Sequence, residues 1–190
     1  PDHISDLVPF LFTCRYGDLP RQKDLLIIGG EGFIKFFNQL TQVFEKWLNA
    51  DNYKLDLKEL VDETIRIGNL RVSTRQPAHC KESVSYRLES SEDQSIVLSG
   101  DTDYCESIIS LGKNADILVL ECSFPDEQKT DGHLSPSAAG KIAAKSKCKK
   151  LILTHFYPLC EKYDLIAECR KTYSGEVVLA EDLMKVQVNS

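Results

Sequence analysis

The stretch Leu151-Ile152-Leu153-Thr154-His155-Phe156 places a histidine directly after a short apolar run. A run of this length and composition predicts a buried strand over residues 151–153. The histidine then stands where the strand ends and a loop begins, a place that holds a side chain rigidly while leaving it open to a ligand. Taken alone, His155 is better explained as a satisfied strand-end residue, so the other candidate residues decide its role.

Similar settings occur upstream of this stretch. In residues 96–101 (IVLSGD), Asp101 follows an apolar run and a glycine that permits a tight turn. Taken alone, Asp101 is better explained as the N-cap of a helix around residues 104–111. His79 follows Pro77 between two predicted strands, and Asp2-His3 opens the chain. Imidazole and carboxylate together are the usual nitrogen and oxygen ligands of a zinc-type ion, which makes a metal site a reasonable prediction.

In this order, the residues resemble the metal motifs of the metallo-β-lactamase superfamily, and within it those of the ribonuclease Z branch. The first motif of the family is His-x-His-x-Asp-His, and Asp2-His3 matches its last two ligands. The later ligands match His79, Asp101 and His155. The resemblance covers nearly the whole chain. It implies an α/β (α+β) fold, the metallo-β-lactamase-like αββα sandwich, incomplete at the N-terminus.

The resemblance also implies how metals would be held. One metal of the family is bound by two histidines that would precede residue 1, together with the positions of His79 and Asp101. The other is bound at the positions of Asp2, His3, Asp101 and His155, with Asp101 bridging the two ions, which lie about 3.5–4 Å apart in such sites. We therefore expect the chain to be the C-terminal portion of a longer parent, and the 190 residues alone to be inactive. Zinc is the expected metal, two ions per complete site, with manganese or iron as alternatives.

The function implied by the resemblance is metal-dependent hydrolysis of a phosphodiester by a metal-bound hydroxide. Asp2 would bind a metal and orient the nucleophile. His133, in Asp131-Gly132-His133-Leu134, matches a family histidine that assists catalysis near the scissile phosphate, by donating a proton or stabilising charge. From the residues alone, His133 can equally be an ordinary loop histidine ahead of a helix.

Two features of the chain bear on the substrate. The tRNA-processing members of the branch carry a long arm before the position of His79, and residues 30–79 contain no such basic arm. The net charge is −6, whereas a nucleic-acid binder usually presents a basic face. The densest lysine cluster, residues 141–150, is typical of a solvated helix face. We therefore expect a small phosphodiester or another ester as substrate, with ribonuclease Z itself (a tRNA 3′-end endonuclease) and a catalytically inactive fragment or binding remnant as the alternatives. Nucleic acid is kept as an alternative partner that these features do not favour. The resemblance is compatible with a homodimer.

The composition, 42% hydrophobic and 27% charged residues, is ordinary for one globular domain, which we expect to span residues 1–190. The seven cysteines are scattered and include no CxxC pair, which favours a reduced, cytoplasmic protein without a cysteine zinc site. Cys122, Cys148 and Cys169 are predicted to be small buried hydrophobes. The sequence shows no membrane span and no signal peptide.

Periodicity predicts alternating strands and helices. The apolar stripe of residues 33–48 predicts a helix that packs on a sheet, in preference to an aromatic binding platform. A helix over 135–147 is expected to begin at an N-cap, Ser135, followed by Pro136. A further helix is predicted over 160–173. Strands are predicted over 24–28, 71–76, 84–88, 95–98, 117–120, 151–153, 176–179 and 184–188.

Overall fold

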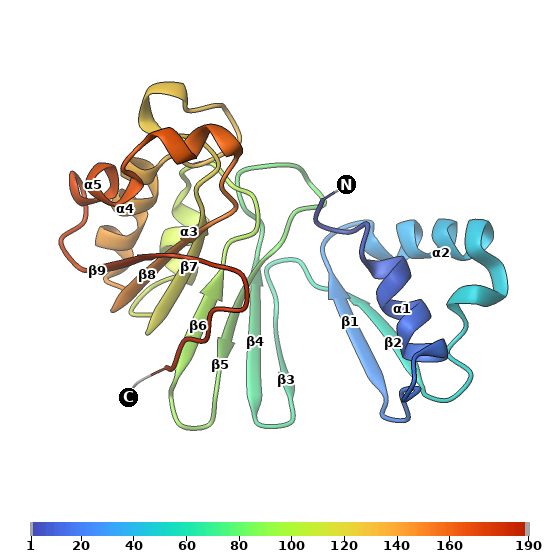
Figure 1. Cartoon of the computed structure of the whole chain (residues 1–190). Helices are drawn as coiled ribbons and strands as arrows, with labels where there is room; N and C mark the ends of the chain where they lie inside the picture. The colour runs from blue at the N-terminus through green and yellow to red at the C-terminus, as the bar shows by residue number, and fades with distance from the viewer. Residues whose placement is uncertain (1, 189–190) are drawn as a thin grey trace. The chain divides into compact units, whose positions relative to one another are not determined.

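The computed structural model describes residues 2–188, which form two compact units that meet in sequence between Leu60 and Val61 (Figure 1). Each unit combines helices and strands, as the predicted α/β class requires. The prediction of one domain over residues 1–190 stays a prediction, because a family domain can consist of more than one compact unit. Within residues 2–188, the helices are too short or too polar to cross a membrane.

The N-terminal unit contains two helices and a parallel pair of strands. Its elements are α1 (Leu7–Tyr16), β1 (Leu25–Gly29), α2 (Phe33–Phe44), a 3-10 turn (Glu45–Leu48) and β2 (Leu55–Glu59). Phe33 and Phe37 of α2 are buried together with Leu11 of α1, and Leu25, Leu55 and Leu57 of the two strands pack against them. The predicted packing of the 33–48 stripe on a sheet is therefore confirmed, although the helix tightens into the 3-10 turn at Glu45.

The C-terminal unit is built on one sheet of seven strands in sequential order (Figure 1). The strands are β3 (Thr64–Ile67), β4 (Leu70–Arg75), β5 (Ser85–Glu89), β6 (Ser95–Leu98), β7 (Ile117–Glu121), β8 (Lys150–Thr154) and β9 (Glu176–Leu179). Pairing is antiparallel from β3 to β6 and parallel from β6 to β9. Because parallel strands end at the same edge, the loops that follow β6, β7 and β8 meet there.

Three helices pack on one another and on this sheet. They are α3 (Glu106–Leu111), α4 (Pro136–Ser146) and α5 (Leu165–Arg170), accompanied by 3-10 turns at Asp126–Gln128 and Pro158–Lys162. Helices α4 and α5 pack on strands of the parallel half of the sheet, and α3 packs on β4 and β5. The main core of the unit lies beneath the helices and includes Cys122, Cys148 and Cys169. The predicted burial of these three cysteines is confirmed, and all seven cysteines of the chain are free thiols.

Two predicted elements differ from the structure. The helix predicted over 160–173 is divided, because Asp164 accepts a hydrogen bond from the Ala167 backbone N–H and so starts α5 anew. The strand predicted over 184–188 is wrong. Those residues form no strand in the described part of the chain, and the side chain of Gln94 donates to the Val188 carbonyl.

Candidate metal site

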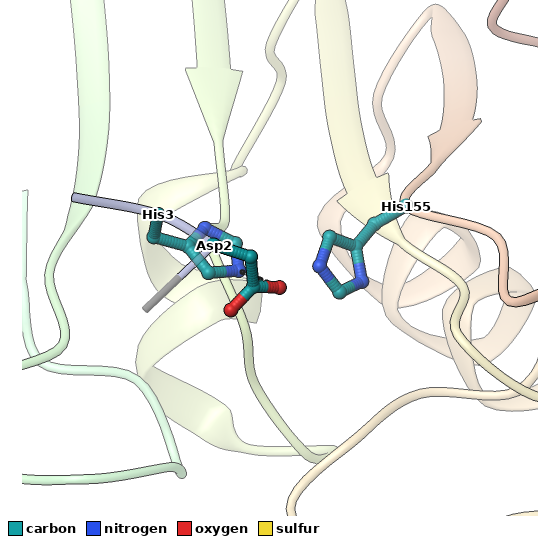
Figure 2. Close-up of side chains that lie close together, drawn as sticks. All are labelled: Asp2, His3 and His155. Carbon is teal, nitrogen blue, oxygen red and sulfur yellow. Dashed lines mark ion pairs between the residues drawn. The ribbon is translucent and has the colours of Figure 1, made fainter. Parts of the chain in front are cut away.

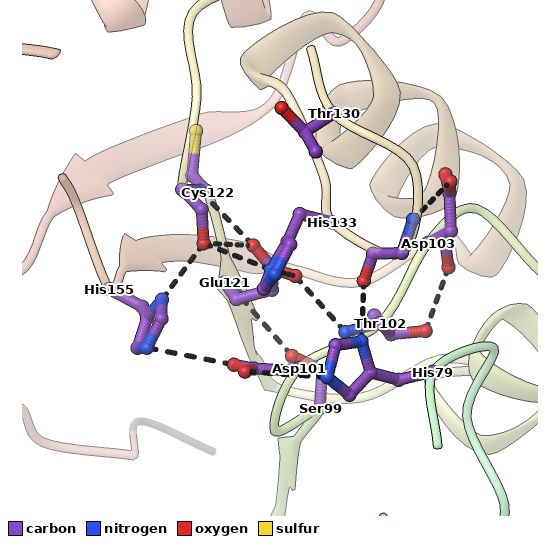
Figure 3. A network of polar contacts seen from close by, with 12 residues as sticks. His79, Ser99, Asp101, Thr102, Asp103, Glu121, Cys122, Thr130, His133 and His155 are labelled. Carbon is purple, nitrogen blue, oxygen red and sulfur yellow. Dashed lines mark hydrogen bonds and ion pairs between the residues drawn. The ribbon is translucent and has the colours of Figure 1, made fainter. Parts of the chain in front are cut away.

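The candidate side chains of the C-terminal unit come from loops at the carboxyl edge of the parallel strands (Figure 3). Asp101 follows β6 after Gly100, whose φ of 61° allows the turn. Glu121 is the last residue of β7, and His155 follows β8 directly. His79 lies in the loop after β4, and His133 in the loop that leads into α4. The fold thus gathers residues that lie far apart in the sequence.

Asp101 lies between two histidines. Its Oδ2 is 3.9 Å from Nε2 of His79, and its Oδ1 is 3.7 Å from Nε2 of His155. The carboxylate is mostly buried, with 11% of the side chain exposed, while the two imidazoles are partly open to solvent. A mostly buried carboxylate flanked by two accessible ring nitrogens is a donor set suited to a divalent ion.

The Nδ1 atoms of both histidines are engaged on the side away from Asp101. His79 Nδ1 is 2.9 Å from the Gly132 carbonyl oxygen, which can only accept, so Nδ1 carries the proton. His155 Nδ1 is 2.8 Å from Ser123 Oγ. A proton on Nδ1 leaves the lone pair on Nε2, and such support of the second ring nitrogen is typical of metal-binding histidines.

A fully buried layer of polar groups lies behind the histidines. Glu121 is 2% exposed, and its Oε2 accepts from both the backbone N–H and the hydroxyl of Ser123, at 3.1 and 2.7 Å. Because the hydroxyl proton of Ser123 goes to Glu121, its oxygen is left to accept from His155. Oε1 of Glu121 accepts from the Thr102 backbone N–H at 3.1 Å, which ties the loop of Asp101 to the same carboxylate.

His133 is held by this layer as well. Its Nδ1 is 2.9 Å from Glu121 Oε1, and its ring centroid is 5.0 Å from that of His79. His79, Asp101 and His133 each offer one donor atom within 4.8 Å of the others. The structure therefore places His133, predicted to be catalytic, among the potential ligands as well.

Asp103, in the loop after β6, contacts both the loop of His79, through its backbone N–H to the Ala78 carbonyl at 2.8 Å, and the loop before α4, through its carboxylate. Its Oδ2 accepts from Lys129 Nζ at 2.8 Å and from the Gly132 backbone N–H at 3.1 Å. Burial raises the pKa of Asp103, but the hydrogen bonds from Lys129 and from the Tyr104 and Gly132 backbones outweigh it and hold the pKa below its ordinary value. The charged carboxylate therefore holds the loop before α4 beside the loop after β6.

His155 has an unusual backbone conformation, with φ of 61°. A non-glycine residue in the left-handed region costs free energy, and such residues concentrate at functional sites. The conformation turns the chain sharply after β8, so that the side chain of His155 reaches both Ser123 and Asp101.

Asp2 and His3 belong to the N-terminal unit, on the turn that precedes α1. His3 Nε2 is 3.6 Å from Asp2 Oδ2, and both side chains are about half exposed or more. Figure 2 shows the side chains of Asp2 and His3 as sticks. The ligand roles predicted for Asp2 and His3 stay predictions.

Sequence reasoning missed Glu121 and Ser123. Glu121 ends the apolar run of β7. Asp101 and His155 were singled out because they also follow apolar runs, so the same criterion could have identified Glu121. Ser123 carried no such signal, because a buried serine is recognised only by its hydrogen-bond partners.

Residues 38–156 match the model of a family described as the beta-lactamase superfamily domain. A ribonuclease Z of Salinispora arenicola is 31% identical over 135 residues, which cover 67% of this chain and 41% of that protein. The probable metallo-hydrolase YhfI of Bacillus subtilis is 27% identical over 187 residues, covering 95% of this chain and 72% of that protein.

Solved structures agree with the sequence matches. The crystal structure of YhfI superposes with a TM-score of 0.77 over 95% of this chain and 70% of that chain. The short form of human tRNase Z, at 19% identity, has a TM-score of 0.72 over 97% of this chain and 74% of that chain, and at that identity it bears on the fold alone. The predicted metallo-β-lactamase-like fold is confirmed.

The matched relatives are longer than this chain. The uncharacterized protein ML1173 of Mycobacterium leprae is 34% identical over 126 residues, which are 64% of this chain and 44% of that protein. The matched part of the chain thus spans less than half the length of ML1173 and of the Salinispora arenicola ribonuclease Z.

Proposed function

Because the chain belongs to the metallo-β-lactamase superfamily, a family of hydrolytic metallo-enzymes, we propose that it is part of a metal-dependent hydrolase that cleaves a phosphodiester. The observation that carries this proposal is the orientation of His79 and His155. Both rings bind a fixed acceptor through Nδ1 and turn Nε2 toward Asp101. Histidines that bind a metal need their rings held in this way, whereas a loop histidine without a ligand does not.

The residues proposed to hold the metals are His79, Asp101 and His155, joined by Asp2 and His3. Imidazole and carboxylate donors fit zinc, and they also accept manganese or iron. A bound divalent ion would acidify a water molecule and polarise the ester. The chain's own contribution is to fix the donors in advance, through Ser123, Glu121 and the Gly132 carbonyl.

His133 is proposed to move a proton to the leaving oxygen. Its Nδ1–H donates to the Glu121 carboxylate, which would offset the positive charge of the ring when Nε2 also carries a proton, and Nε2 would then pass that proton to the leaving oxygen. The rings of Phe124 and Tyr157 stand edge-on to His133, with centroids 5.7 and 6.5 Å away, and stack on each other. They cover one side of the imidazole and limit the access of water to it.

A small phosphodiester is the favoured substrate. Of the five lysines in 141–150, Lys145, Lys149 and Lys150 already pair with Glu106, Asp116 and Glu176. They are therefore poorly placed to bind a nucleic-acid backbone. Ribonuclease Z activity is the second candidate, which the similarity to the Salinispora arenicola enzyme favours. Tight tRNA binding that weakens steeply with salt would support that second candidate over the first.

Zinc titration by calorimetry tests the metal site, and hydrolysis of bis(4-nitrophenyl) phosphate by the whole gene product tests the reaction. Asp101→Asn should weaken zinc binding by at least about tenfold. His133→Ala should lower the hydrolysis rate by about 10²–10⁴-fold while the protein still binds zinc. Asp126→Asn serves as the control, because Asp126 is a partly buried carboxylate that bonds to Ser137 and to none of the proposed metal ligands.

Two outcomes would count against the proposal. Zinc affinity that is the same in Asp101→Asn as in the unchanged protein would remove Asp101 from the site. A whole gene product that binds one ion weakly and hydrolyses neither the test ester nor tRNA would favour the binding-remnant alternative.

A further inference from the structure

A second polar site lies on the antiparallel half of the large sheet. A pocket of about 280 Å³ is formed between β4, β5 and the C-terminal end of α3. Its lining includes four cations and one carboxylate, namely Arg71, Arg75, Arg87, Lys113 and Glu89. Three net positive charges are thus concentrated in one pocket of a chain whose net charge is −6.

The position of these residues in the sheet is unexpected. Strand pairing sets Ser73 beside Arg87, and Arg87 beside Val97 of β6. The same row continues through Leu118, Leu151 and Val177, all of which belong to the core under the helices. Residues in one row of a sheet share a face. The helix-covered face therefore changes from apolar to basic where it passes from β6 to β5.

Protection of a sheet edge does not explain the arginines. Charged residues on edge strands prevent edge-to-edge pairing, but β3 is the edge strand here, and β4 and β5 are paired on both sides. The side chains also point out of the sheet face, where they give no protection to backbone groups.

Two of the four cations form ion pairs within the protein. Arg71 and Arg87 both pair with Glu89, at 2.6 and 3.1 Å, and Arg87 also donates to the carbonyls of Leu111 and Lys113 at the end of α3. Arg75 donates to the Thr74 carbonyl and, like Lys113, forms no ion pair within residues 2–188. Two cations are held in place, and two are available to a ligand.

We propose that this pocket binds the phosphate groups of a phosphorylated ligand. The planar guanidinium of arginine matches phosphate oxygens in pairs, and Ser73 and Ser110 add hydroxyl groups to the lining. The volume lies at the lower end for small-molecule pockets, which suits a phosphate or diphosphate group. The proposal stands on its own and does not depend on the hydrolase activity.

The test is calorimetric titration with inorganic pyrophosphate, in EDTA so that metal-bound phosphate does not contribute. Arg75→Gln combined with Lys113→Gln should weaken pyrophosphate binding by at least about tenfold, because two charge-assisted contacts are lost. Neither side chain forms an ion pair in the part of the chain that is described, so the double variant should unfold at the same urea concentration as the unchanged protein.

Two controls separate this pocket from other sources of binding. Lys141→Gln, which removes an exposed lysine of α4, should leave pyrophosphate affinity unchanged. Asp101→Asn should also leave it unchanged, which keeps the outcome independent of the metal site. A parallel titration with a short oligothymidylate shows whether the phosphate comes from a small molecule or from a nucleic-acid strand.

The two probes distinguish the sources of phosphate. Weakened binding of pyrophosphate in the double variant supports a small phosphorylated ligand, and weakened binding of the oligonucleotide alone supports a nucleic-acid strand as the source. Equal binding by the double variant and the unchanged protein, or no binding of either probe, overturns the proposal.

Discussion

At the scale of single residues, the histidines of the site are oriented by what their Nδ1 atoms contact. His79 is fixed by a backbone carbonyl and His155 by a hydroxyl, so the two ligands differ in how easily a substitution can disturb them. A carbonyl cannot be removed by mutation, whereas the hydroxyl of Ser123 can. The contact between Ser123 and His155 can therefore be tested directly by mutation.

Ser123→Ala should weaken zinc binding by about tenfold, because His155 loses the acceptor that holds its ring. Glu121 loses one hydrogen bond at the same time but keeps the Ser123 backbone N–H. Competition with a chromogenic chelator measures the affinity. Ser146→Ala is the matched control, since Ser146 is an equally buried serine whose hydroxyl bonds within α4. Equal zinc affinity in the two variants would show that Ser123 does not position His155.

The left-handed backbone of His155 leads to a separate prediction about stability. Asparagine tolerates positive φ, so metal-free His155→Asn should be about as stable as the unchanged protein. His155→Val should be less stable by about 1–2 kcal/mol, because a β-branched side chain is strained there. Urea unfolding in EDTA measures both free energies. Equal stability of the two variants would mean that the backbone relaxes at this position.

At the scale of elements, Asp116 joins the beginnings of three strands. Its carboxylate accepts from the backbone N–H and hydroxyl of Ser95 at the start of β6, and from Lys149 just before β8. Burial raises the pKa of Asp116, but the hydrogen bonds from Lys149 and Ser95 outweigh it and hold the pKa below its ordinary value. The charged form therefore stabilises the folded state.

Asp116→Asn should lower the free energy of unfolding by about 2 kcal/mol near neutral pH. A folded-state pKa below the unfolded one gives stability that is present above the ordinary carboxyl pKa, about 4, and is lost as the pH falls through the folded value. The difference between the two proteins should therefore shrink in acid, as followed by urea unfolding at several pH values. Glu92→Gln, which alters an exposed carboxylate in the β5–β6 turn, should show no such difference. If the difference in unfolding free energy between the two proteins did not change with pH, the stabilising role assigned to the charged Asp116 carboxylate would be contradicted.

The elements also show what the sequence could predict. Buried parallel strands such as β7 and β8 were predicted within one residue or so at each end, because a short continuous apolar run between polar segments is typical of a strand covered on both faces. β2 (LDLKE) and β3 (TIRI) were missed, because short strands with alternating polar residues are stabilised by their partners and carry little local signal. Within the candidate site, the residues at strand ends were visible for the same reason, and the buried Ser123 was not.

At the scale of the whole molecule, the seven free cysteines divide by burial. Cys122, Cys148, Cys160 and Cys169 are buried, Cys80 is exposed, and Cys14 and Cys105 are intermediate. Burial raises the pKa of the Cys169 thiol to about 11 and also raises the pKa of the Cys122 thiol. Little thiolate is therefore present at these positions near neutral pH.

In the native protein, a thiol reagent such as DTNB should label Cys80 first, the two intermediate cysteines more slowly, and the four buried ones only after unfolding in urea. Mass spectrometry of the labelled peptides identifies each position. Cys80→Ser should abolish the fastest phase alone. Rapid labelling of Cys122 or Cys169 in the native protein would mean that the core beneath the helices opens readily.

The parallel order of β6, β7 and β8 has a consequence for how the protein acquires its site. Asp101, Glu121 and His155 lie at the ends of successive strands, separated along the chain by crossovers that contain α3 and α4. Parallel pairing gains its contacts only after those long loops have closed, so it is a slow step of folding. The donor atoms thus converge late, when the strands are already aligned. A metal ion present during folding would stabilise the finished sheet and give no help to its assembly.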